Sequence, residues 1–223
     1  LDLIEYSKDN EVNHDNVQDI LKKRMKNITK KSKLLYVYRE LVKNKEIKPN
    51  NTIEKSLTKK LNKQMDGVIT VTVSLPPFYE FFDKKSGKMK KKRFSCEYDC
   101  YYCPNPKGGV RSYPHDSPSQ LRARRNGYDA ILQFCDRLKV LENNGHPLDK
   151  IELIVLGGTW SSFEMDFRRE FMRDLYYAVN TYYLAMNGEE LPEKKDLEHE
   201  MLINEDTKCK IIGVTLETRP DCL

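Results

Sequence analysis

Residues 151–159 read Ile151-Glu152-Leu153-Ile154-Val155-Leu156-Gly157-Gly158-Thr159, and this stretch decides the fold. An apolar run of this length is typical of a strand buried on both faces of a parallel sheet. Residues 68–75 and 211–216 read as two further strands, the first of them alternating and rich in β-branched side chains. The sequence therefore predicts three strands, each separated from the next by more than 50 residues.

Helical patterns fill the two long intervals between these strands. One helix is expected over residues 119–144, with Ser119 as its N-cap, and another over residues 164–186, followed by a charged connection to residue 208. Strands that alternate with helices in this way predict an α/β fold with a parallel sheet, the first three βα units of a partial (βα) barrel. The third strand would leave an open sheet edge, so we expect either a fragment or a protein that something else completes.

The N-terminal part has a different character. Residues 1–66 are expected to form a small basic helical region, and residues 67–223 the barrel. The first 14 residues read as an unstructured or fraying start, and helices are expected over residues 16–25, 32–45 and 53–61. A basic, glycine-containing loop over residues 83–93 then leads to a group of cysteines.

Charge is distributed unevenly along the chain. Residues 1–93 hold 23 basic and 12 acidic residues, a formal charge of +11, whereas the remainder holds 16 and 22, a charge of −6. A segment this basic favours a polyanionic partner, although lysine runs can also be plain solvated surface. No apolar run has the length of a membrane span, and the N-terminus is acidic rather than signal-like. We therefore expect a cytoplasmic protein that does not enter a membrane.

The cysteines after the basic loop have a spacing with chemical meaning. Cys96, Cys100 and Cys103 form a C-x3-C-x2-C pattern. Three thiolates suit a 4Fe-4S cluster in which one iron lacks a protein ligand and can chelate a small molecule. This spacing is typical of radical S-adenosylmethionine (SAM) enzymes, in which that molecule is SAM. A zinc site is the alternative, and its fourth ligand would be His115, Cys135, Cys209 or Cys222.

Each predicted strand is followed by residues that could build a site. The cysteines follow the first strand, Gly157-Gly158-Thr159 the second, and Glu217 and Arg219 the third. In βα barrels the loops at the carboxyl ends of the strands form the active site, so all three motifs should share one rim. Strand-end carbonyls beside the glycines could bind the SAM ammonium. Glu217 could bind a ribose hydroxyl or the methionine amine, and Arg219 a carboxylate or phosphate, unless the two form an ordinary salt bridge.

Several stretches resemble one family in particular. They are KSKLLYVYRELVKNKEI, DGVITVTVSLPP, CYYCP, PSQLRARRNGYDA, GHPLDKIELIVLGGTW and IIGVTLETRPD, which lie in order from about residue 31 to the end. Together they resemble the family of the catalytic subunit of Elongator, which modifies the wobble uridine of tRNA. In this chain Cys96 takes the role of a first cysteine that the family places farther upstream, and Asn105-Pro106 replaces a pair of glycines.

The resemblance implies a fold, cofactors and partners. It implies a radical SAM barrel in which Cys96, Cys100 and Cys103 hold a 4Fe-4S cluster, SAM is cleaved to a radical, and acetyl-CoA is the co-substrate. Lys150 matches a lysine associated with acetyl-CoA binding. Arg122, Arg124 and Arg125 would face tRNA or line the cleft, and Lys91, Lys92 and Arg93 are further candidates for RNA binding. The family also implies other Elongator-like subunits and a C-terminal acetyltransferase domain, which this sequence does not include.

Two other interpretations stay open at this point. The chain could be a radical SAM enzyme with a different activity on RNA, or a zinc-stapled basic module that binds RNA without catalysis. The metal distinguishes the zinc-stapled module from either enzyme.

Overall fold

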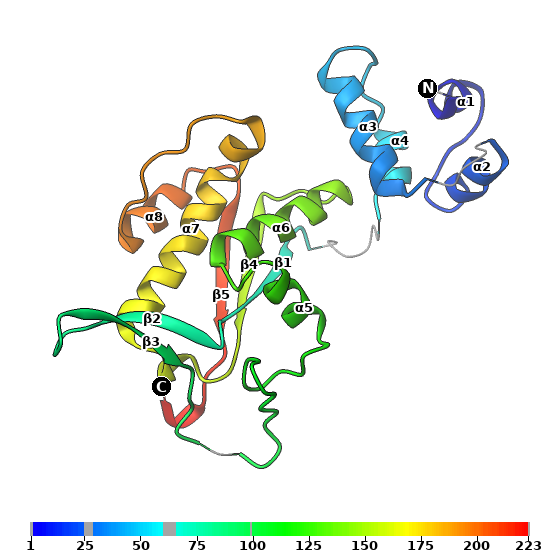
Figure 1. Cartoon of the computed structure of the whole chain (residues 1–223). Coiled ribbons are helices and arrows are strands. Elements are labelled where there is room, and N and C mark those ends of the chain that lie inside the picture. Colours follow the sequence, from blue (N-terminus) through cyan, green and yellow to red (C-terminus); the bar gives the residue numbers. More distant parts are fainter. Residues whose placement is uncertain (1, 25–28, 60–65, 99, 223) are drawn as a thin grey trace. The chain divides into compact units, whose positions relative to one another are not determined.

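The computed structural model describes residues 2–24, 29–59, 66–98 and 100–222 (Figure 1). The chain divides into two compact units. Unit 1 consists of residues 1–68 and 139–147, and unit 2 of residues 69–138 and 148–223. None of the described helices has both the length and the apolar character that crossing a bilayer requires.

Unit 1 is a group of short helices with a core of its own. Its helices are α1 (Asp2–Asp9), α2 (Val17–Arg24), α3 (Lys31–Lys43) and α4 (Asn51–Leu57). The buried side chains of this core are Val12, Val17, Leu21, Leu35, Tyr38, Ile53 and Leu57. Residues 139–147 join this unit through hydrogen bonds from Arg39 Nη1 to Glu142 O (2.9 Å) and from Lys59 N to Asn144 O (2.9 Å).

Two expectations about unit 1 are corrected. The start of the chain is not unstructured, because α1 forms and its Leu3, Ile4 and Tyr6 pack against the core. Helix α4 begins two residues earlier than expected because the Asn50 side chain caps it, accepting hydrogen bonds from the backbone N–H groups of Thr52 and Ile53. It ends at Leu57; the last two residues of the predicted helix, 60 and 61, lie outside the described residues.

Unit 2 is built on a three-stranded parallel sheet, which confirms the predicted α/β fold. Strands β1 (Ile69–Ser74), β4 (Lys150–Leu156) and β5 (Lys210–Leu216) pair in the order β1-β4-β5. Parallel strands that neighbour one another in chain order are the arrangement with which a βα barrel begins. The expectation that β4 is buried on both faces is wrong for one face. Leu153 and Val155 are buried, whereas Ile154 and Leu156 stay partly exposed because the described residues cover that face incompletely.

The basic segment before the cysteines is a hairpin and not the predicted loop. Strand β2 (Phe78–Asp83) pairs antiparallel with β3 (Lys88–Arg93). The turn is held by the Asp83 carboxylate, which accepts hydrogen bonds from Lys85 N (3.1 Å) and Ser86 Oγ (2.7 Å). Gly87 closes the turn at a φ of +65°, a left-handed conformation that glycine adopts without a steric penalty.

The helices of unit 2 also differ from the expectation. The predicted helix over residues 119–144 is two helices, α5 (Pro118–Arg125) and α6 (Ala130–Asn143), because Gly127 and Tyr128 adopt positive φ between them. Ser117, not Ser119, holds the N-cap position of α5, with Pro118 as the first helical residue. Helix α7 (Met165–Asn187) matches the prediction, and the charged connection after it contains a further helix, α8 (Leu197–Asn204).

The free edge of β1 is covered by side chains from α5 and α6. Gln133 acts as a neighbouring strand would: its Oε1 accepts from Ser74 N (2.9 Å) and its Nε2 donates to Ser74 O (3.0 Å). Arg122 Nη2 donates to Thr72 O (3.0 Å) on the same edge. Ser74 is fully buried, so these bonds satisfy backbone groups that water does not reach. They fix the end of β1, from which the chain continues toward the cysteines.

Candidate functional site

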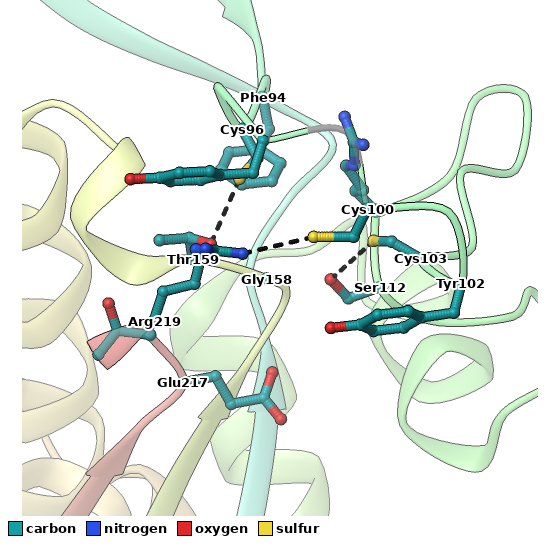
Figure 2. Close-up of a pocket in the computed structure, with 13 residues that line it drawn as sticks. Phe94, Cys96, Cys100, Tyr102, Cys103, Ser112, Gly158, Thr159, Glu217 and Arg219 are labelled. Carbon is teal, nitrogen blue, oxygen red and sulfur yellow. Dashed lines mark hydrogen bonds between the residues drawn. The ribbon is translucent and has the colours of Figure 1, made fainter. Parts of the chain in front are cut away.

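A pocket lies at the carboxyl ends of the three parallel strands, where the predicted motifs converge. Its lining consists of Phe94, Cys96, Tyr98, Cys100, Tyr102, Cys103, Arg111, Ser112, Gly158, Thr159, Glu217, Thr218 and Arg219. Figure 2 shows Cys100 and Cys103 on one side of this pocket, Glu217 and Arg219 on the other, and Cys96 above Thr159. The structure thus brings together three stretches separated by up to about 120 residues of sequence.

Each cysteine of the motif has a different polar neighbour. Cys96 Sγ lies 3.4 Å from Thr159 Oγ1, and Cys103 Sγ lies 3.5 Å from Ser112 Oγ. Cys100 Sγ accepts a hydrogen bond from Arg219 Nη1 at 3.4 Å. These neighbours come from the stretches that follow β4 and β5 and from the loop after the cysteines, so the whole rim positions the thiols.

The environment of Cys103 favours its thiolate. Burial raises the pKa of this thiol, but hydrogen bonds from Ser112 and Arg111 and the positive charge of Arg111 outweigh that effect and lower the pKa below its ordinary value. A thiolate, not a thiol, is the form that binds a metal.

The donor set of the pocket is of the kind that an iron–sulfur cluster uses. In the described part of the chain, no three His, Cys, Asp or Glu side chains stand close enough to share one metal ion. Three thiols nevertheless line a single pocket, together with cationic Arg111 and Arg219. A cluster spans several ångströms and carries negative charge on its sulfurs, so separated thiolates among cations suit it.

Glu217 is held firmly at the rim. One carboxylate oxygen accepts a hydrogen bond from the hydroxyl of Tyr113, and the other accepts from Gly157 N at 3.2 Å. The backbone carbonyl of Glu217 in turn accepts from Trp160 N at 2.8 Å. Burial and the bond to Glu217 raise the pKa of Tyr113, so this hydroxyl stays a proton donor. Glu217 is therefore oriented before any ligand arrives.

Arg219 has its partners within the chain. Its guanidinium lies over the Tyr98 ring, 3.7 Å from the ring centroid, and makes a two-pronged bond with the Asp221 carboxylate at 2.9 Å for each pair of atoms. The bond to Asp221 raises the pKa of Arg219. Its fourth contact is the bond to Cys100, so this arginine ties the end of β5 to the cysteine loop.

The two glycines after β4 are needed where they lie. A Cβ at Gly157, whose φ is +136°, would lie 2.8 Å from Leu75 Cβ. A Cβ at Gly158, with φ at +92°, would lie 3.1 Å from the Phe94 ring and 3.3 Å from Ser112 Oγ. Both the backbone conformation and the crowding therefore favour glycine, which keeps this side of the pocket open.

Other residues singled out from the sequence lie away from the pocket. Lys150 is the first residue of β4 and is exposed at the opposite end of the sheet. Arg122 is bonded to β1, Arg124 donates to His115 O (3.2 Å), and Arg125 pairs with Asp136 (3.1 Å). The remaining candidates, Lys91, Lys92 and Arg93, are exposed on β3.

The four candidates for a fourth zinc ligand do not line the pocket either. Cys135 lies on α6, where burial raises the pKa of its thiol to about 11, and Cys209 is buried just before β5. Cys222 Sγ lies 3.7 Å from the Tyr98 hydroxyl, and His115 Nε2 lies 3.2 Å from Lys107 O.

Sequence reasoning missed several polar or aromatic residues that complete the site, among them Tyr98, Arg111, Ser112 and Tyr113. Tyr98 lies between two cysteines and could have been noticed as an aromatic platform for a cation. The other three lie in an irregular loop after the cysteines, and no periodic pattern marks them.

Comparison with known proteins identifies relatives. No protein-family model matches the chain. It is 32% identical over 163 residues to tRNA uridine(34) acetyltransferase of Dehalococcoides mccartyi, covering 73% of this chain and 30% of that protein. It is 35% identical over 130 residues to Elongator complex protein 3 of Drosophila melanogaster, covering 56% of this chain and 22% of that protein. The chain thus spans less than a third of the length of these relatives.

A solved structure, that of Methanocaldococcus infernus Elp3 with an N-terminal deletion, is also similar. The two sequences are 26% identical, and the match covers 70% of this chain and 24% of the solved chain, with a TM-score of 0.44. The sequence matches confirm the resemblance to the catalytic subunit of Elongator.

Proposed function

We propose that this chain, which is Elongator Elp3-like in sequence, takes part in modifying the wobble uridine of tRNA by radical SAM chemistry. The observation that carries the proposal is the convergence of three motifs in one pocket: the cysteine loop, the Gly157-Gly158-Thr159 turn and the Glu217/Arg219 pair. An ordinary structural turn or rim salt bridge would not require all three at the same strand ends. The activity named for the relatives, uridine(34) acetyl transfer, sets the substrate class of the proposal.

The residues of the pocket take separate roles in this proposal. Cys96, Cys100 and Cys103 would hold a 4Fe-4S cluster, with one iron left for SAM. When both are bound, they supply one-electron chemistry, the reductive cleavage of SAM to an organic radical. Glu217, fixed by Tyr113 and Gly157, would accept hydrogen bonds from SAM hydroxyl or amine groups. The ring of Phe94 would shield one wall of the pocket from water, and the glycine turn would leave room for the ligand.

Arg219 would act as a positioning residue. Its bond to Cys100 and its place over Tyr98 hold the cysteine loop against the end of β5.

The RNA and acetyl-CoA parts of the proposal rest on different residues. The +11 charge of residues 1–93 suits a polyanion such as tRNA. Lys150 would serve acetyl-CoA, as the resemblance implies, at a place remote from the pocket. Arg124 and Arg125 stay exposed and could meet RNA, whereas Arg122 supports β1.

Anaerobic reconstitution with iron and sulfide tests the proposal. We expect about four iron atoms per chain, visible charge-transfer absorption, and 5′-deoxyadenosine when SAM and dithionite are added. Cys100→Ala should lose the iron. Cys135→Ala is the matched control and should keep it, because Cys135 lies on α6 outside the pocket.

The zinc-stapled interpretation gives the opposite result. A chain that takes up zinc alone, or in which both cysteine variants lose metal equally, would refute the cluster assignment. If the chain with its cluster forms 5′-deoxyadenosine but does not bind tRNA, the radical SAM part of the proposal stands and the tRNA part is refuted.

A further inference from the structure

The hairpin of β2 and β3 places cations and aromatic rings together on its outer face. Side chains alternate between the two faces of a strand, so the register assigns six residues to this face. They are Phe78, Glu80 and Phe82 of β2, opposite Arg93, Lys91 and Met89 of β3, and all are exposed. Phe78 and Phe82 keep 44% and 47% of their surface exposed, unusual for phenylalanine, whose side chain is normally buried.

The inner face of the same hairpin packs against other residues of this chain. Tyr79 packs against the rings of Phe163 and Phe167, with centroids 5.0 and 4.7 Å away. Lys92 pairs with Glu164 at 3.0 Å, and this bond raises the pKa of the lysine. Lys90 pairs with Asp83. Two of the inner cations, Lys90 and Lys92, are therefore neutralised by carboxylates of this chain, and the third, Lys88, lies opposite Asp83 beside the turn.

The outer cations are not neutralised in this way. In the described ranges neither Lys91 nor Arg93 takes part in an ion pair, and the carboxylate nearest in register is Glu80, opposite Lys91. The outer face thus combines two unpaired cations with two exposed rings. Its partner should be anionic and should offer flat surfaces to the rings.

We propose that the outer face of this hairpin binds a single-stranded segment of RNA, with phosphates on Lys91 and Arg93 and bases stacked on Phe78 and Phe82. Proteins that hold single strands without strong sequence preference combine a basic track with aromatic platforms in this manner. The two rings are four residues apart on β2, about 13 Å at the usual rise of a strand, which leaves room for more than one base between them. The proposal rests on the proposed function, because it names the part of the chain that receives the RNA.

The hairpin leads directly to the pocket. Phe94, which follows Arg93, continues the pairing by donating its N–H to Pro77 O (2.9 Å), and its ring lines the pocket. Cys96 is only three residues beyond Arg93. Figure 1 shows the hairpin leaving the sheet where β1 ends. A strand of RNA on the outer face would therefore deliver a base to the rim on which the cysteines lie.

A pair of matched double variants tests this proposal in the full chain. Lys91→Gln with Arg93→Gln removes two outer cations, and Lys90→Gln with Lys92→Gln removes two inner ones, so the change in net charge is the same. Binding of a fluorescent 12-nucleotide oligouridylate is measured by anisotropy over a range of salt. We expect the outer pair to weaken binding at least tenfold and to reduce the salt slope by about 0.7 per removed cation. The inner pair should change the affinity less than twofold.

The stacking part is tested separately by Phe82→Leu, which keeps an apolar side chain and removes the aromatic face. A loss of at least about fivefold for the oligouridylate is expected, with less effect on a blunt RNA duplex whose bases are already stacked. Circular dichroism melting checks that each variant is folded.

The outcomes are distinct from those of the proposed function. Equal loss from the inner and outer pairs would mean diffuse attraction and would refute the proposed face, as would unchanged affinity in the outer pair. Binding of the chain to vesicles with anionic lipid, abolished by the outer pair while RNA binding persists, would also refute it. Iron content and 5′-deoxyadenosine formation are measured on the same variants. If these stay normal while the RNA result fails, the hairpin proposal is wrong and the radical SAM proposal stands.

Discussion

At the rim of the pocket, the lack of a side chain matters at some positions as much as the side chains at others. Gly157 is the clearest case. Its backbone N–H donates a hydrogen bond to the Glu217 carboxylate, and a Cβ at this position would collide with Leu75. Gly127, between α5 and α6, also has a positive φ, but a Cβ there would meet nothing within 4 Å. Gly157 therefore combines crowding with a φ of +136°, outside the left-handed helical region, whereas Gly127 has only a left-handed φ of +59°.

This difference gives the first prediction. Gly127→Ala should lower the free energy of unfolding by about 1 kcal/mol, since only the left-handed backbone is disfavoured. Gly157→Ala should cost about 1–3 kcal/mol more, because its φ of +136° is less accessible to alanine and the new methyl group must displace Leu75. Urea denaturation followed by circular dichroism measures both. Equal losses would contradict the extra strain expected at Gly157.

Also at the scale of single residues, Cys135 and the pocket thiols should differ in their rate of alkylation. Burial on α6 raises the pKa of Cys135 to about 11, so at pH 8 almost none of it is thiolate. We expect iodoacetamide to modify Cys135 more slowly than the cysteines that line the pocket in chain without metal. Mass spectrometry of timed samples measures this. Faster labelling of Cys135 would contradict its burial.

At the scale of elements, the sheet depends on a side chain that substitutes for a strand. Gln133 satisfies both backbone groups of Ser74, and Ser74 is fully buried. Gln133→Leu fills a similar volume but leaves a buried N–H and C=O without partners, at about 1–3 kcal/mol for each group. We expect destabilisation of that order and faster hydrogen exchange at the end of β1. Gln18→Leu on α2, an exposed site, is the control and should be nearly neutral.

The hairpin turn should respond to acid in a defined direction. Hydrogen bonds from Lys90 and Ser86 lower the pKa of Asp83 from an ordinary value of 3.8 to about 2. A carboxyl whose pKa is depressed on folding stabilises the fold above its unfolded pKa and loses that effect as pH falls through the folded value. The Asp83 contribution should therefore be present above about pH 4 and disappear toward pH 2. Carboxyl NMR titration should give a midpoint near 2, and Lys90→Gln should raise it; a midpoint at the ordinary value would rule out the turn geometry.

The sequence predicts those elements that have a regular pattern of apolar residues, and it does not predict those that depend on tertiary contacts. The three parallel strands and the convergence of their motifs follow from apolar runs and from the rule that strand ends share a rim. Strand β3 escapes notice because lysine is depleted in strands and only the pairing with β2 makes it one. The break at Gly127 and Tyr128 lies inside an unbroken apolar pattern, and contacts such as Tyr113 with Glu217 depend on loop geometry that no period encodes.

At the scale of the whole molecule, two separate cores divide the stability. Leu35 is fully buried in unit 1 and Leu153 in unit 2. Either substitution to alanine should cost about 2–5 kcal/mol in its own unit. Hydrogen exchange with mass spectrometry should show Leu35→Ala raising exchange in residues 2–59 and 139–147 while β4 stays protected, and Leu153→Ala the reverse. A uniform rise in both variants would indicate one cooperative unit.

The composition of unit 1 has a consequence for synthesis on the ribosome. Its core helices come first in the chain, yet the segment that contributes Glu142 and Asn144 is made only after residues 69–138. At about 5–20 residues per second, the 79 residues from 69 to 147 take about 4–16 s to appear. During that interval Arg39 and Lys59 cannot form their hydrogen bonds to the carbonyls of Glu142 and Asn144. The N-terminal helices therefore complete unit 1 only after the first residues of unit 2 have left the exit tunnel.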